Sequence, residues 1–160
     1  MTEVNWPTPF GYTIFCDDIR HELDGKTTLV GIYATDMIFR IPLPAILPKL
    51  GFVIKYFERP GESSDPVKIQ IFLPGDEQDK PTIEAELPYE EMRARPPPSD
   101  PEAKDPRIGV SLNLGMAPFK VAKEGRIKVQ AIRGSEVIRL GSLRVKVAPK
   151  DQSEPAPSAA

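Results

Sequence analysis

Residues 108–116 read IGVSLNLGM, with an apolar side chain at every second position. Side chains of a β-strand point alternately to opposite faces, so this spacing predicts a strand with one buried face. The same alternation returns at residues 67–73 and 83–87. Residues 52–57 (FVIKYF) are rich in aromatic and β-branched side chains, which favour strands on both faces. Short runs of this kind are typical of an all-β protein.

The prolines and glycines between these runs support the same fold class. The chain has 160 residues, 40% of them hydrophobic and 28% charged, which suggests one globular domain. Its 19 prolines and 11 glycines fall between the apolar runs, and no long stretch keeps a helical spacing. We therefore predict a single antiparallel β-sandwich, immunoglobulin-like in broad layout, with about seven to nine strands.

The predicted boundaries follow from composition. The sandwich is expected to span residues 9–148, after an N-terminal extension at 1–8. Six prolines in residues 88–107 predict a long loop, and residues 149–160 lack large apolar side chains and are expected to be disordered. Two prolines limit residues 43–50 to a turn of helix at most.

Turn residues predict two hairpins and a bulge. Asp24-Gly25 suits a two-residue type I′ turn, which would place Ile19 opposite Val30. Gly134-Ser135 suits a type II′ turn, which would place Arg133 opposite Glu136. The apolar residues of the last strand change parity midway, so we expect one extra residue, a β-bulge, at Gly141-Ser142.

The number of cysteines and the lengths of the apolar segments limit the cellular compartments in which the protein is expected. Cys16 is the only cysteine, so it cannot form an internal disulfide, which favours a reducing compartment and a cytoplasmic protein. No apolar run approaches the ~20 residues of a membrane span, and no signal peptide is expected. The sequence contains neither a phosphate-binding loop motif nor a nucleophile-elbow motif. We therefore favour a protein that is not an enzyme, and the sequence indicates no cofactor.

The densest polar cluster is residues 16–22 (CDDIRHE). One hypothesis is a metal-dependent hydrolase that uses Asp17, Asp18 and His21. A zinc site needs more nitrogen and sulfur ligands than one histidine and one cysteine supply. The favoured interpretation is structural: Asp18 pairs with Arg20, and Arg20 holds a carboxylate across the hairpin in a partly buried place.

Charge is uneven along the chain. Residues 1–106 hold 11 basic and 19 acidic side chains, whereas residues 107–160 hold 10 basic and 4 acidic ones. A basic outer face of the C-terminal hairpin could bind anions or nucleic acid weakly. Phe119 is the only aromatic residue of that half, so stacking with bases is not supported and nucleic acid is disfavoured. A solvated face that protects strand edges is the preferred interpretation. The basic candidates are Lys120, Lys123, Arg126, Lys128, Arg139, Arg144 and Lys146.

The stretch FCDDIRHELDGKTTLVGIY at residues 15–33 resembles the opening hairpin of a family of short, uncharacterised bacterial and phage-related proteins, a domain of unknown function. The family pattern reads F-x-D-D-I-R…G-K…L-[IV]-G-[IV]-Y. The resemblance implies no activity, substrate or cofactor. The positions taken as a structural or binding cluster are Asp17, Asp18, Arg20, Lys26 and Tyr33. The other matching positions are Phe15, Ile19, Gly25, Leu29 and Gly31.

These observations predict a non-enzymatic binding or assembly module whose partner is another protein. Sandwiches commonly present loops or an edge strand to a partner, and the loop at 88–107 is the preferred candidate surface.

Overall fold

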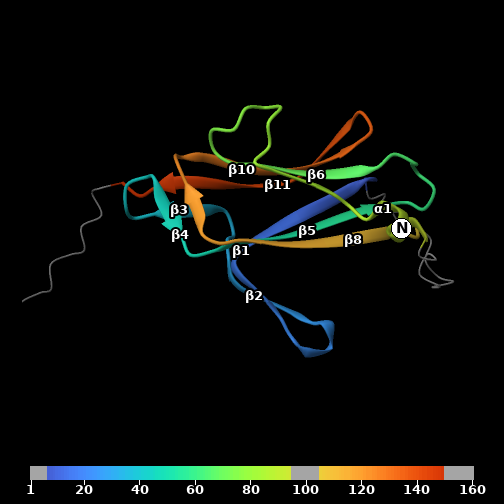
Figure 1. The fold of residues 1–160 in the computed structure, drawn as a ribbon, viewed down its shortest axis with the longest axis horizontal. Coiled ribbons are helices and arrows are strands. Elements are labelled where there is room, and N and C mark those ends of the chain that lie inside the picture. The colour runs from blue at the N-terminus through green and yellow to red at the C-terminus, as the bar shows by residue number, and fades with distance from the viewer. Residues whose placement is uncertain (1–6, 95–104, 150–160) are drawn as a thin grey trace, which may run out of the picture.

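The computed structural model describes residues 7–94 and 105–149. Residues 150–160 of the predicted disordered tail, most of the N-terminal extension and the middle of the proline-rich loop lie outside these residues. The described chain is almost entirely β-structure and forms a two-layer sandwich (Figure 1), which confirms the predicted fold class.

One layer is a four-stranded antiparallel sheet. Its order across the sheet is β2 (Thr27–Ile32), β1 (Phe10–His21), β5 (Leu50–Glu58) and β8 (Ile108–Met116). The other layer has five strands, in the order β3 (Asp36–Phe39), β11 (Glu136–Val147), β10 (Gly125–Arg133), β6 (Val67–Phe72) and β7 (Ile83–Glu86). A two-stranded ribbon pairs β4 (Ala45–Leu47) with β9 (Phe119–Val121).

The nine strands of the two main sheets match the predicted seven to nine, and the ribbon raises the total in the described residues to eleven. One pair is parallel, β3 with β11, and the other strand pairs are antiparallel within the described residues. The segment at 43–50, expected to be at most a turn of helix, contains β4 instead, because β9 offers it a pairing partner.

The core lies between the sheets. Strand β5 is central to its sheet, and its inward side chains Phe52, Ile54 and Tyr56 are fully or almost fully buried. The ring of Phe52 meets Phe15 and Phe119 edge-on, at centroid distances of 5.6 and 6.4 Å. Burial of apolar surface of this extent is the main force that holds two sheets together.

The predicted bulge exists, one residue earlier than expected. Strand β11 pairs Arg139 with Gln130 and Gly141 with Val129, so Leu140 is the extra residue. Gly141 has φ of +129°, a conformation that side chains disfavour. The bulge brings Ile138, Leu140 and Leu143 to the buried side. The predicted pairing of Arg133 with Glu136 is confirmed.

The register predicted for the first hairpin is wrong by one residue. Ile19 lies opposite Leu29, because the loop has three residues, Leu23–Gly25, and the Glu22 N–H donates to the Lys26 carbonyl at 2.8 Å. Asp24 and Gly25 do have the positive φ that the turn required, at 63° and 73°.

The described part of the proline-rich segment is more ordered than a loop. Residues Tyr89–Ala94 form the short helix α1. Met92 is almost completely buried in the core, as is Leu87 just before the helix. These two side chains anchor the start of the segment, so the prediction of a loop at residues 88–107 is wrong for this part.

Candidate binding surfaces

The hairpin of β1 and β2 projects from the sandwich (Figure 1). Strand β1 pairs with β5 as far as Cys16, which lies opposite Gly51, and then continues with β2 alone to His21. The projecting part has little core to bury its apolar side chains. Leu23 is 88% exposed, Ile32 is 58% exposed, and Val30 is also exposed.

The base of the hairpin is held by a contact between two predicted site residues. The Tyr33 hydroxyl donates a hydrogen bond to Asp17 Oδ1 at 2.6 Å, and the Tyr33 N–H donates to the Phe15 carbonyl at 2.9 Å. Burial, then the Asp17 carboxylate, raises the pKa of Tyr33 above its usual value. Gly31 has φ of +66°, and the Asp17 carboxylate occupies the space that a Cβ there would need.

Asp18 faces a different set of partners. Lys49 Nζ lies 2.6 Å from Asp18 Oδ1, and Arg20 Nε lies 3.3 Å from Oδ2. The hydrogen bonds from Lys49 and then Arg20 lower the pKa of Asp18. The predicted pairing of Asp18 with Arg20 therefore exists. The expectation that Arg20 bridges the hairpin in a partly buried place is wrong, because its side chain is 63% exposed and its partner is on the same strand.

The remaining hairpin candidates do not assemble into a catalytic site. His21 and Lys26 are exposed, and neither side chain has a hydrogen bond or ion pair within the described residues. Across residues 7–94 and 105–149, no three His, Cys, Asp or Glu side chains lie close enough together to hold a metal ion. Cys16 is fully buried, and burial, followed by the nearby Asp17 and Asp18, raises the pKa of its thiol. A thiol of this kind is a poor nucleophile.

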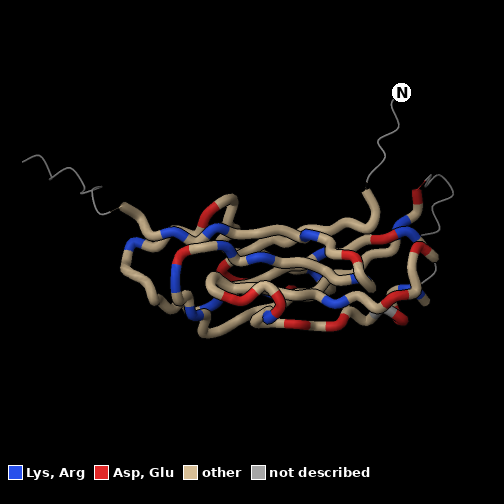
Figure 2. Tube along the Cα trace, turned by 90° about the horizontal axis from the view of Figure 1, so that it is seen from above, with Lys and Arg blue, Asp and Glu red and all other residues tan. Residues whose placement is uncertain are grey.

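A second surface is a groove of about 640 Å³ on the outer face of the five-stranded sheet. Arg126 and Lys128 of β10 and Arg139 of β11 line it, together with the loop that follows β6. Figure 2 views the molecule from this side, with the basic positions of the chain in blue and the acidic ones in red. The loop is tied down by Asp76, whose carboxylate accepts hydrogen bonds from the Leu73 N–H at 2.8 Å and from Thr82.

The predicted basic face divides into paired and unpaired cations. Arg144 contacts Asp36 at 2.9 Å, and Lys146 contacts the same carboxylate. In contrast, Arg126, Lys128 and Arg139 have no carboxylate partner among the residues that the structure describes. Among the described residues, the Arg126 guanidinium donates a hydrogen bond only to the Ser142 hydroxyl, at 3.3 Å. Lys120 lies on β9, which belongs to the separate two-stranded ribbon. Lys123 follows β9, and its side chain lies beside Gly75, which lines the groove.

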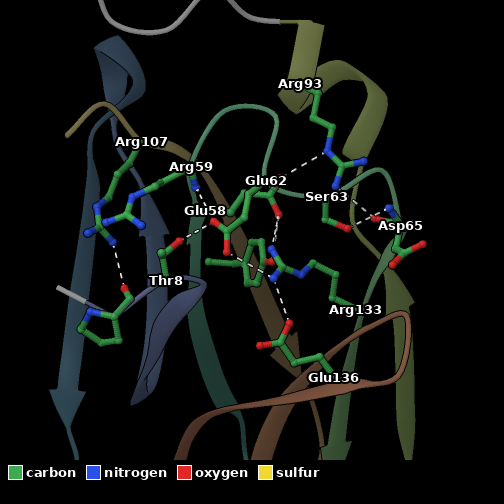
Figure 3. A network of polar contacts seen from close by, with 12 residues as sticks. Thr8, Glu58, Arg59, Glu62, Ser63, Asp65, Arg93, Arg107, Arg133 and Glu136 are labelled. Carbon is green, nitrogen blue, oxygen red and sulfur yellow. Dashed lines mark hydrogen bonds and ion pairs between the residues drawn. The ribbon is translucent and has the colours of Figure 1, made fainter. Parts of the chain in front are cut away.

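A buried polar network lies at the far end of the sandwich from β4 and β9 (Figure 1), and Figure 3 shows its members from close by. Glu58 is fully buried and contacts two arginines of the described chain: Arg133 Nη1 lies 3.3 Å from its Oε2, and Arg93 Nε lies 3.2 Å from its Oε1. The Tyr56 hydroxyl donates to the same carboxylate at 3.0 Å. Arg133 also contacts Glu136 at 2.8 Å.

Sequence reasoning missed this network. The only signal was the predicted pairing of Arg133 with Glu136 across a turn, since nothing local shows that Glu58 ends a strand in the opposite sheet. Each charge is matched by an opposite charge, and the members come from β5, β10, β11 and α1. The network therefore joins the two sheets and the helix, and we assign it a structural role.

The comparisons with known proteins leave the chain without a family assignment. Neither the protein-family models, nor the curated proteins, nor the solved structures include a significant match to it. Within the described part of the chain, no helix has the length and apolar character that crossing a membrane requires.

Proposed function

We propose that the protein is a non-enzymatic binding or assembly module and that the projecting hairpin contacts a partner protein. The observation that carries the proposal is the exposure of Leu23, Val30 and Ile32 on an element whose base is held by Tyr33 and Asp17. Apolar surface exposed on a projecting element is typical of protein contact sites.

The backbone of β2 supports the same proposal. Strand β2 is an edge strand, with β1 on one side and no strand on the other within the described residues. Its sequence, TTLVGI, contains neither a charged residue nor a proline, the usual protection of an edge. A partner can therefore add a strand along residues 27–30 and cover Val30 and Ile32 at the same time.

Site-specific photo-crosslinking tests this proposal in the cells that produce the protein. A photoreactive amino acid replaces Ile32 in one variant and Ile46, which is more exposed but lies on β4, in the control. We expect a discrete heavier adduct from position 32 and none from position 46. Adding Val30→Asp should remove the adduct. Equal labelling at both positions, or an adduct that survives Val30→Asp, would contradict the proposal.

Anion binding in the groove is the second candidate function. Three adjacent cations without carboxylate partners repel one another, and a bound anion would relieve that repulsion. The probe is a fluorescent poly-glutamate peptide, with a single-stranded oligonucleotide of equal charge in parallel. We expect binding of the peptide that weakens steeply with salt and is lost in Lys128→Glu but kept in Arg20→Glu. Binding that is insensitive to salt or to Lys128→Glu would contradict this candidate.

Other features of the proposal rest on the sequence. We keep the immunoglobulin-like layout, the cytoplasmic location and the contribution of residues 88–107 to partner binding as parts of the proposal. The free, buried Cys16 supports a reducing compartment. The hydrolase alternative gains no support from the described residues, because Asp17 and Asp18 have separate partners.

A further inference from the structure

We propose that two copies of this chain associate through the free edge of β8, so that the two four-stranded sheets become one continuous sheet. This contact is separate from the hairpin surface, because β8 and β2 form opposite edges of the same sheet.

The edge of β8 is unprotected. All nine residues of β8 pair with β5 on one side, from Ile108 opposite Glu58 to Met116 opposite Leu50. On the other side, no strand or backbone hydrogen bond is present within the described residues. Alternate N–H and C=O groups of an antiparallel strand point away from its partner, so these groups are available to another strand. Natural proteins normally blunt such an edge with charge or proline, and IGVSLNLGM has neither.

The sequence of β8 is complementary to itself. Antiparallel pairing around a two-fold axis at Asn113 places Leu112 opposite Leu114 of the second copy and Val110 opposite Met116. Apolar side chains then face apolar side chains, and small or polar ones face each other on the outer surface. The inward side chains Val110, Leu112, Leu114 and Met116 are only partly buried, so the second copy completes their burial.

Helix α1 favours this register. The helix contacts β8, and its Arg93 reaches Glu58, which lies opposite Ile108. This ion pair places Arg93 near the Ile108 end of β8. A two-fold axis at Asn113 pairs residues 110–116 and leaves that end unpaired.

The other edges fit a second copy less well. Strand β7 presents Glu84 and Glu86, so self-pairing would bring four carboxylates together. Strand β3 has four residues and includes Asp36. Strand β2 loses its extended conformation at Gly31, where φ is +66°. Strand β8 is therefore the longest edge on which two identical strands meet without like charges.

The experiment measures mass and proximity in the full chain. Light scattering coupled to gel filtration, at about 1 to about 100 μM protein, covers micromolar dissociation constants. We expect twice the mass of one chain for the wild type and for Val137→Lys, an exposed control on the other sheet. Asn113→Lys should give the mass of one chain with an unchanged circular dichroism spectrum, because two ammonium groups would lie opposite each other.

A crosslink tests the register. Asn113→Cys should give a covalent dimer with a short bismaleimide, since directly opposite Cβ atoms lie about 5 Å apart. Val137→Cys should not, and the buried native Cys16 is protected. A wild type with the mass of one chain, or equal crosslinking from both positions, would overturn the proposal. A dimer that survives Asn113→Lys but dissociates in Ile32→Asp would also overturn it, because it would place the contact on the hairpin.

Discussion

The carboxylate of Glu58 and the guanidinium of Arg133 form an ion pair between the two sheets, with 3.3 Å between Oε2 and Nη1. Glu58 ends β5 and Arg133 ends β10, and their side chains are 0% and 8% exposed. Arg93 Nε contacts the second carboxylate oxygen of Glu58, Oε1. Both oxygens are therefore matched, as a buried charge requires.

Arg133→Met tests the importance of this pair. Among the described residues, the substitution leaves the buried Glu58 with Arg93 as a cationic partner. Removal of one member of a buried pair costs about 3–5 kcal/mol. We expect a loss of unfolding free energy toward the lower end of that range in urea denaturation, because Arg93 remains. The control Arg139→Met changes an exposed arginine and should cost no more than about 0.5 kcal/mol. Equal losses in the two variants would show that the pair is not structural.

Gly31→Ala tests the base of the hairpin. Alanine at φ of +66° is strained, and its Cβ would displace the Asp17 carboxylate that accepts the Tyr33 hydrogen bond. Gly25→Ala is the matched control, since Gly25 has φ of +73° but open space around it. The strain should cost each variant about 1–2 kcal/mol. Gly31→Ala should cost about 1 kcal/mol more for the lost hydrogen bond, measured by thermal unfolding. Identical melting temperatures would argue against the role of Asp17.

Arg20→Ala separates the sequence-based expectation from the structure. An arginine that is 63% exposed and paired on its own strand should contribute less than about 1 kcal/mol to stability. We expect a nearly unchanged urea midpoint. A loss of several kcal/mol would instead support the sequence-based expectation that Arg20 bridges the hairpin in a partly buried place.

Acid unfolding should report on Asp36. Hydrogen bonds from Arg144 and Lys146 hold the pKa of this carboxyl at about 2, below the usual value near 4. Its stabilising contribution is therefore complete above about pH 4 and is lost as the pH falls toward about 2. Asp36→Asn should lower the melting temperature at pH 6, and the difference from the wild type should shrink at pH 2. The exposed control Asp79→Asn should follow the wild-type curve. A difference that stays constant with pH would contradict this assignment.

The sequence by itself determined the alternating strands, the sandwich class and the positions of the two hairpin turns, but not the register of the first hairpin. These features depend on neighbours within a few residues: the period-two pattern at 108–116, the positive φ at Asp24 and Gly25, and the parity change that requires a bulge near Gly141. Local sterics and the alternation of faces dictate such features, so they can be predicted from residue order.

Only the tertiary structure decided which distant groups meet. Arg133 lies 75 positions from Glu58, and Lys49, 31 positions from Asp18, is the nearest partner of that carboxylate. The edge position of β8 depends on strand order, which local residue patterns do not specify. Contacts of this kind arise from packing the whole core, because burial determines which strands become neighbours and which polar groups must then find partners.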